Sequence, residues 1–561
     1  MQRFIMRRLI TRQFMFLFPV CLFLFCFSVS IAVAADNRPN IVFIFTDDHA
    51  YQAISAYHQA LSPEQAGPLR NTTPHLDRLA AEGMLFTRCC VTNSICAPSR
   101  AAIKTGKYGH LNGVMANYNR FDSSQQTFPR LLQQAGYQTA MIGKWHLGEE
   151  LNANSAGFDH TEVLFGQGPY YNPPMARNGE RVQHTGYTTR IITDLSLEWI
   201  RNRDPSQPFL LMKHHKAPHR EWDPYPYYFE RYRDAVFEFP ATFDSNHAGR
   251  GRAALEQDMT IAETMNLRDV KVNMPQQFLN SLTEEQLAGW NQMFGNRRAE
   301  FEAVRHDPVA LTRWKYQMFM RDYMSCVASV DAAVGRVLQF LEDEGLAENT
   351  LVIYSSDQGF FLGEHGWFDK RFMYNESFKT PLIMRLPGRI KPGHINHDIV
   401  SNLDFGPTFL DVAGVPVPED MQGYSLVPLF QGETPADWRQ YFYYHYYEYP
   451  GVHMVKKHYG VYDGRFKLIH FYDDIDEWEL YDLKYDPNEL QNVYSDPKYA
   501  QEIARLHAAL ARLKVELKVP PVEINTQSYI FDRPLDERPG LRGTILRLRG
   551  DIERRRAAME R

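Results

Sequence analysis

The stretch Ser94-Ile95-Cys96-Ala97-Pro98-Ser99-Arg100-Ala101-Ala102-Ile103-Lys104 joins a loop to a run of helix-compatible residues. Because proline is favoured in the first turn of a helix, this order predicts that Cys96 lies at a helix N-terminus. Such an end presents free N–H groups and a partial positive charge, which favour anions. Arg100, Lys104 and the following Lys107 add cationic groups suited to a sulfate or phosphate ester. The alternative is a buried structural cysteine, because free cysteines often pack as small apolar residues.

Two apolar runs, residues 40–45 and 351–354, predict strands that are buried on both faces of a parallel sheet. Each run is followed by oxygen-bearing side chains, which are Asp47, Asp48, Asp357 and Gln358. Open α/β sheets bind ligands at the carboxyl ends of their strands, and carboxylates there suit calcium or magnesium. The alternative is that these acids only cap turns.

Two further predicted strands end in basic residues. Residues 139–143 lead into Lys144 and His146, and residues 208–213 lead into a histidine-rich loop that contains His219. A lysine and a histidine at a strand end can bind an anionic ester and move a proton. A single pair of this kind is more often a solvated turn, so the interpretation depends on its recurrence along the chain.

Composition and length describe a large globular protein. The chain has 561 residues, 44% of them hydrophobic and 23% charged, and its formal net charge is −6. A net charge of this size does not indicate a basic surface that binds nucleic acid. Outside the first 35 residues there are four cysteines, which do not form the framework of a disulfide-rich protein: Cys89, Cys90, Cys96 and Cys326.

The first 35 residues have the layout of a signal peptide. Four arginines precede the apolar run 14–33, and the small residues 32–35 offer a cleavage site near Ala34 or Ala35. We therefore expect an exported protein, periplasmic or secreted. The alternative is an uncleaved membrane anchor, because the run is long enough to span a bilayer.

The rest of the chain predicts an α/β domain over residues 36–420 and a smaller subdomain over 421–530, followed by an Arg-rich tail at 531–561. Apolar periodicity predicts helices at residues 75–83, 188–202, 316–345 and 500–518, and a strand at 85–92. Residues 225–314 are interpreted as a helical insertion that shapes the substrate pocket. Short aromatic runs at 441–449, 457–462, 465–471 and 479–482 predict an antiparallel sheet.

The segment Cys96-Ala97-Pro98-Ser99-Arg100 resembles the signature of the type I sulfatases. Residues 143–148, Gly-Lys-Trp-His-Leu-Gly, are similar to a second sulfatase motif, and residues 485–492 resemble the closing motif of many members. Five such blocks in family order span residues 38–494. The resemblance implies an alkaline-phosphatase-like fold, with a large mixed, mostly parallel sheet between layers of helices. It also implies that Cys96 is converted to formylglycine, by a formylglycine-generating enzyme or an anaerobic sulfatase-maturing enzyme.

The resemblance implies a role for each motif residue. Asp47, Asp48, modified Cys96, Asp357 and Gln358 would bind calcium, with magnesium possible, although many members carry Asn at the position of Gln358. Lys144, Lys370 and Arg100 would stabilise charge on the sulfuryl group. His219 would protonate the leaving alcohol, and His146 would act as a base in releasing sulfate. Further substrate contacts are expected from His215, Trp222 and Arg371.

The substrate that the resemblance implies is a sulfated glycan. Residues 215–222 and 363–376 look most like bacterial N-acetylglucosamine-6-sulfatases or mucin-desulfating sulfatases. Aromatic residues beside the motifs suit stacking on a sugar and suit a packed wall equally well: Trp222, Trp367, Phe368 and Tyr374. Three alternatives stay open, namely another glycan or aryl sulfatase (iduronate- or choline-type), a phosphonate or phosphate monoester hydrolase of the same superfamily, and a non-catalytic glycan-binding protein.

Overall fold

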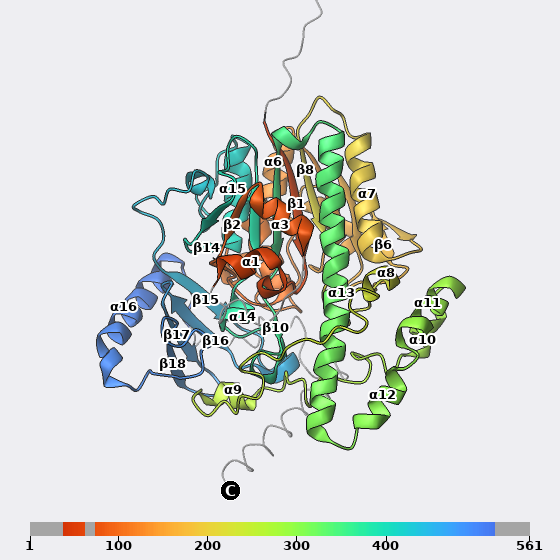
Figure 1. Cartoon of the computed structure of the whole chain (residues 1–561). Helices are drawn as coiled ribbons and strands as arrows, with labels where there is room; N and C mark the ends of the chain where they lie inside the picture. Colours follow the sequence, from red (N-terminus) through yellow and green to blue (C-terminus); the bar gives the residue numbers. More distant parts are fainter. Residues whose placement is uncertain (1–37, 62–72, 522–561) are drawn as a thin grey trace, which may run out of the picture. The chain divides into compact units, whose positions relative to one another are not determined.

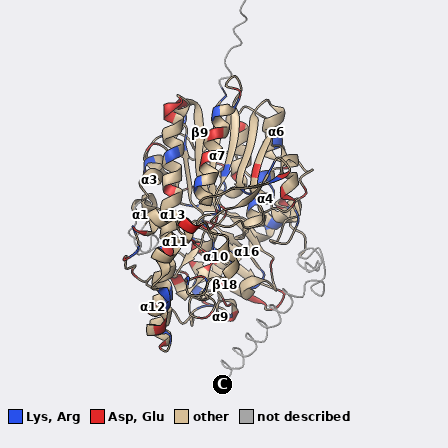
Figure 2. Ribbon diagram, turned by 90° about the vertical axis from the view of Figure 1, so that its right-hand side faces the viewer, with Lys and Arg blue, Asp and Glu red and all other residues tan. Residues whose placement is uncertain are grey.

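A ten-stranded mixed sheet forms the core of the computed structural model, which describes residues 38–61 and 73–521 (Figure 1). The predictions of a signal peptide at 1–35 and of a tail at 531–561 lie outside the described residues. The predicted domain boundary at residue 420 stays a prediction. Basic and acidic residues are interspersed along the ribbon in Figure 2.

The middle of the sheet is parallel and its edges are mixed. Strands β9, β1, β8, β4 and β5 lie side by side and all run in the same direction. The full order is β13 (His394–Asn396), β2 (Met84–Phe86), β12 (Leu382–Arg385), β9 (Thr350–Ser356), β1 (Asn40–Thr46), β8 (Phe209–His214), β4 (Gln138–Lys144), β5 (His160–Leu164), β6 (Pro174–Arg177) and β7 (Glu180–Gln183).

Strand β1 is apolar throughout because helices cover both faces of the sheet. Val42 and Ile44 belong to the core on the face covered by α1 (Ser55–Ala60), α3 (Pro74–Ala81), α7 (Thr188–Asn202) and α13 (Pro308–Asp343). Ile41, Phe43 and Phe45 point the other way, as the period of two requires, toward α4 (Cys96–Thr105), α6 (Phe128–Gln134) and α15 (Phe405–Val412). The prediction of an α/β sandwich is confirmed.

The strand predicted at residues 85–92 is wrong as a single element. The chain forms β2 in the large sheet and then β3 (Cys89–Cys90), which pairs with β14 (Val400–Ser401) in a separate two-stranded sheet. Strand β2 still runs in the direction of β1, because it is antiparallel to β12, which is antiparallel to β9. The following α4 is therefore delivered to the carboxyl edge, as predicted.

Helix α13 begins eight residues before the predicted start at Tyr316. The Asp307 side chain caps it by accepting from the backbone N–H groups of Val309 and Ala310, and Pro308 occupies the first turn. Its most apolar window has a mean hydropathy of 1.3 and is 83% buried within the protein, so packing on the sheet accounts for its composition.

Residues 225–307 of the predicted insertion form short helices and irregular segments, and residues 308–314 belong to α13. The helices are α8 (Pro226–Phe229), α9 (Arg252–Glu256), α10 (Gln276–Asn280), α11 (Glu284–Phe294) and α12 (Arg297–Val304). Thr283 and Gln286 form a capping box at the start of α11.

The predicted C-terminal antiparallel sheet is confirmed. It contains β15 (Phe442–Tyr446), β16 (His458–Tyr462), β17 (Phe466–Phe471) and β18 (Glu477–Asp482), in that order. Helix α16 (Ala500–Glu516) packs its apolar side, including Leu506 and Leu510, on this sheet. One aromatic residue of this sheet reaches the segment before α4, because the backbone N–H of Ser94 donates to the Tyr444 hydroxyl at 3.2 Å.

Candidate active site

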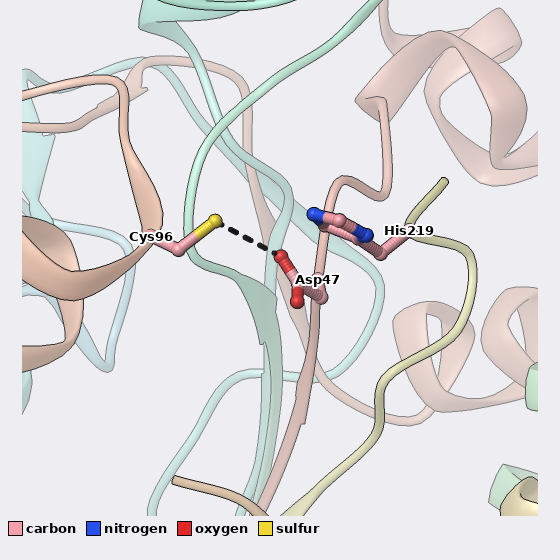
Figure 3. A group of neighbouring side chains, drawn as sticks. All are labelled: Asp47, Cys96 and His219. Carbon is pink, nitrogen blue, oxygen red and sulfur yellow. Dashed lines mark hydrogen bonds between the residues drawn. The ribbon is translucent and has the colours of Figure 1, made fainter. Parts of the chain in front are cut away.

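The predicted site residues gather at the carboxyl edge of the central parallel strands. Asp47 follows β1, Asp357 follows β9, and Lys144 ends β4. Thr46 pairs in register with Ser356, so the acids that follow these two strands emerge side by side. The prediction that the strand-end acids meet the cysteine is confirmed, because the Cys96 thiol donates to Asp47 Oδ1 at 3.4 Å. Figure 3 shows Cys96 and His219 on either side of Asp47.

Cys96 is the first helical residue of α4, as predicted, but the helix end itself offers little to an anion. Ala97 N–H already donates to the side-chain oxygen of Asn117 at 3.0 Å, and Pro98 has no N–H. At most one free N–H of the first turn is left, so side chains must provide the anion contacts. Burial raises the pKa of the Cys96 thiol to about 12, although Lys370 opposes this. The unmodified thiol is therefore a poor nucleophile.

The carboxylates form a cluster suited to a divalent cation. Asp47, Asp48 and Asp357 each place an oxygen within 4.8 Å of the others, and all three are buried. The Gln358 amide donates to Asp48 at 2.5 Å, while its buried oxygen has no hydrogen-bond partner among the described residues. Four hard oxygen donors of this kind fit calcium or magnesium. A cation held there would polarise the oxygens of a bound sulfate group.

Three cations balance the three carboxylates. Arg100 donates to Asp357 through Nε (3.2 Å) and Nη2 (3.0 Å), Lys144 pairs with Asp47, and Lys370 contacts both oxygens of Asp48 at 2.6 and 2.7 Å. A divalent ion would add two positive charges to this set, which favours binding of an anionic ester. Burial raises the pKa of Asp48 to about 6, against the opposing effect of Lys370.

Arg100 contacts a carboxylate of the cluster and a backbone carbonyl. Its side chain is wholly buried, and its remaining nitrogen donates to the carbonyl of Lys144 at 3.0 Å. The predicted role of Arg100 in stabilising charge on a sulfuryl group stays a prediction, and its contacts show that it holds Asp357. Lys144 and Lys370 are the cations of this cluster whose flexible ammonium groups can reach both a carboxylate and a ligand.

One ring nitrogen of His219 is hydrogen-bonded to the backbone, and the other faces the site. Nδ1 lies 2.6 Å from the carbonyl of Arg220, which only accepts, so Nδ1 carries a proton. Nε2 lies 3.7 Å from Asp48 Oδ2. Burial, with Lys144 and Lys370 nearby, lowers the pKa of His219 well below its usual value. A role as proton donor requires a second proton on this ring, and Asp48 is the group that would stabilise it.

The insertion holds the loop that carries His219. Arg220 forms a bidentate ion pair with Asp269 at 2.7 and 2.6 Å, and Lys271 donates to the carbonyl of Glu221 at 2.5 Å. On the other side the Tyr170 hydroxyl donates to the carbonyl of His219 at 2.6 Å. The insertion thus fixes the position of the loop that carries His219.

Comparisons with known proteins agree with this geometry. A family model described as "Sulfatase" matches residues 39–415, and a model for the C-terminal region of N-sulphoglucosamine sulphohydrolase matches residues 363–516. The chain belongs to the sulfatase family. The alkaline-phosphatase-like fold and an activity as a sulfuric ester hydrolase follow from this membership. Sulfatases generally use a formylglycine and a divalent metal, and Cys96 and the carboxylate cluster fit both.

Individual relatives show which sulfatases the chain resembles. An N-acetylglucosamine-6-O-sulfatase of Bacteroides thetaiotaomicron is 46% identical over 519 residues, covering 89% of this sulfatase and 91% of the relative. The human N-acetylglucosamine-6-sulfatase is 28% identical over 441 residues, covering 74% and 68%. A solved structure of a protein with its substrate D-glucosamine-2-N,6-O-disulfate matches with a TM-score of 0.83 and 46% identity, covering 87% of this sulfatase and all of that chain.

His215 does not belong to the substrate pocket of the sulfatase. It bonds Lys213 Nζ through Nε2 at 2.5 Å. The alternation along β8 explains this placement, because Lys213 and His215 point to one face while His214 points to the other and lies 3.4 Å from Arg100. The predicted substrate contact of His215 is wrong.

Trp222 belongs to a packed wall. It has no exposed surface, and its ring packs against Phe319, Phe360 and Phe368. The predicted stacking on a sugar is corrected, since no ring face is free. Trp367, Phe368 and Tyr374 are buried in the same way.

Arg371 lies at the site but is held by the protein. Its guanidinium pairs with Asp369, which also lies 3.2 Å from His453 Nε2. The predicted substrate contact of Arg371 stays a prediction. The Arg371 charge interacts electrostatically with Cys96, but Asp369 already binds one of the guanidinium nitrogens.

Two residues that were not predicted from the sequence support the signature helix. The Ser99 hydroxyl donates to the carbonyl of Asp357 at 2.5 Å and accepts from Asn402 at 2.9 Å, which ties α4 to the loop after β9. Asn117 occupies the N–H of Ala97, and its own N–H donates to Glu448 at 2.8 Å. Ser99 lies within the signature and could have been named; Asn117 carries no local signal.

Proposed function

We propose that this sulfatase removes the 6-O-sulfate from N-acetylglucosamine or glucosamine residues of a sulfated glycan. The observation that carries the proposal is the 46% identity to the Bacteroides N-acetylglucosamine-6-O-sulfatase, which extends over nearly the whole of both chains. The match to a structure holding D-glucosamine-2-N,6-O-disulfate supports the same sugar and the same ester position.

The site residues divide the work as their contacts suggest. Lys144 and Lys370 flank the carboxylate cluster and would bind the sulfate oxygens. His219 would deliver the proton that the leaving 6-hydroxyl needs, with Asp48 stabilising the charged ring. The nucleophilic oxygen would come from formylglycine made at Cys96, since the thiol itself is held protonated.

The proposal includes calcium as the resident ion, because the amide oxygen of Gln358 and three clustered carboxylates form a flexible all-oxygen set. It also includes a maturation enzyme acting on Cys96. Export rests on the sequence of residues 1–35 alone.

The test is sulfate release by the matured, calcium-loaded protein from N-acetylglucosamine-6-sulfate. N-acetylglucosamine-3-sulfate, galactose-6-sulfate, N-acetylglucosamine-6-phosphate and an aryl sulfate serve as the comparison substrates. We expect the 6-sulfate to give the highest kcat/KM, with at least tenfold preference over each comparison substrate. Faster turnover of the phosphate would identify a phosphate monoester hydrolase, and turnover of aryl sulfates alone would place the specificity elsewhere.

A further inference from the structure

A Gly166-Gln167-Gly168 turn places an amide between two residues of the active site. Strand β5 is parallel to β4, and Lys144 pairs in register with Leu164, so the chain leaving β5 emerges beside Lys144. Gly166 and Gly168 have φ values of +54° and +67°, which a glycine adopts without strain. A Cβ on Gly168 would also lie 2.8 Å from the side chain of Leu164. The two glycines therefore set the position of Gln167.

The two ends of the Gln167 amide contact different partners. Its Oε1 accepts from Lys144 Nζ at 2.5 Å, and its Nε2 lies 3.2 Å from His146 Nε2. An ammonium group only donates, so the amide oxygen must face Lys144. The NH2 group must then face His146, and a nitrogen that receives this N–H must itself be unprotonated. The contacts thus specify that Nε2 of His146 carries no hydrogen.

We propose that Gln167 is a positioning residue that holds His146 as the neutral Nδ1–H tautomer and holds Lys144 beside Asp47. This inference rests on the proposed function and deepens it. His146 then offers an N–H donor to the reaction through Nδ1 and not a basic nitrogen through Nε2, which differs from the base role that the family resemblance implies.

Two observations support this state of the ring. His146 Nδ1 is buried and has no hydrogen-bond partner among the residues that the structure describes, so its hydrogen is the one left to find an acceptor in the site. Burial lowers the pKa of His146 well below its usual value, and the nearby cations Lys144, Arg100, Lys370 and Lys216 act in the same direction, so a charged ring is disfavoured. His146 also has a φ of +54°, a strained conformation for a non-glycine residue, which the surrounding contacts must stabilise.

The test compares Gln167→Glu and Gln167→Ala with the wild-type enzyme, matured and loaded with calcium. A carboxylate accepts from both neighbours, so Gln167→Glu would move the proton of His146 to Nε2 and favour the charged ring. We expect kcat to fall by about 10- to 100-fold in both variants with KM changed less than about threefold. In Gln167→Glu alone, the pH dependence of kcat should also shift to higher pH. Gln339→Ala, an exposed glutamine on the outer side of α13, serves as the control and should match wild type.

A spectroscopic reading keeps this inference separate from the substrate proposal. Nitrogen-15 NMR of histidine-labelled enzyme, with the His146 signals identified by their absence in His146→Ala, reports which ring nitrogen carries hydrogen. We expect Nδ1–H in the wild type and Nε2–H or the charged ring in Gln167→Glu. An Nε2–H ring in the wild type would overturn the inference, and so would a Gln167→Glu variant with wild-type kcat or a change in KM alone. Loss of activity on 6-sulfated sugars in the wild type would instead refute the proposed function.

Discussion

Replacing Arg100 by methionine tests whether this residue holds the carboxylate cluster or contacts the sulfate. Arg100 is wholly buried, and two of its nitrogens donate to Asp357 at 3.2 and 3.0 Å. Removing one partner of a buried ion pair costs about 3–5 kcal/mol, because the other charge is left uncompensated. The carbonyl of Lys144 also loses its 3.0 Å donor, which adds about 1 kcal/mol. We therefore expect Arg100→Met to lower the free energy of unfolding by about 4–6 kcal/mol.

Urea unfolding of the metal-free and calcium-loaded proteins measures this loss. Calcium should recover part of it, because the ion takes over the compensation of Asp357. The matched control is Lys104→Met, one helical turn along α4. Lys104 is also buried, lies 4.7 Å over the Trp145 ring, and has no hydrogen-bond partner for Nζ among the described residues. Its removal should be neutral or stabilising. An Arg100→Met protein with wild-type stability and no activity would refute the reasoning and assign Arg100 to the substrate.

Three further outcomes follow from the same structure. Metal-free protein with unmodified Cys96 should resist iodoacetamide at pH 8, since a thiol with a pKa of about 12 is only about one part in ten thousand thiolate; rapid alkylation of Cys96 in the native state, followed by mass spectrometry, would contradict this. Gln358→Ala should weaken calcium binding in calorimetry by about tenfold, or about 1.4 kcal/mol, and an unchanged affinity would remove Gln358 from the ligand set. Burial lowers the pKa of Lys379 to about 8, so the unfolded chain binds one more proton between pH 8 and 10.5 and stability rises across that range. Lys379→Met should reduce this rise, to which other buried lysines such as Lys104 and Lys213 also contribute, and should stabilise the protein at pH 7 by up to about 3 kcal/mol; a rise of unchanged size in the variant would exclude Lys379 as a contributor.

The central strands and their functional ends were predictable because both carry local signals. Apolar runs that stop at Asp47 and Asp357 can be recognised within a few residues, and so can the proline that starts α4. The order of the ten strands could not be predicted, since the antiparallel pairing of β12 with β2 joins segments far apart in sequence. The split of residues 85–92 between two sheets depends on the same long-range pairing.

The contacts of some site residues could not be predicted from sequence motifs alone. His215 lies within the histidine-rich loop, yet the strand alternation turns it away toward Lys213. From the sequence, Trp222 could either stack on a sugar or pack inside the protein, and only its packing against Phe319 in the structure decides between the two. Gln167 was missed because one glutamine between two glycines is a common turn, and its meaning depends on the parallel pairing of β4 with β5.

The most direct test of the central claim is peptide mass spectrometry across Cys96, carried out on the same enzyme sample that is assayed for sulfate release from N-acetylglucosamine-6-sulfate. The account predicts that the converted fraction of Cys96, thiol to aldehyde, tracks the activity from one preparation to the next, and that Cys96→Ala has none. Full activity with an unmodified cysteine, or in Cys96→Ala, would contradict the account.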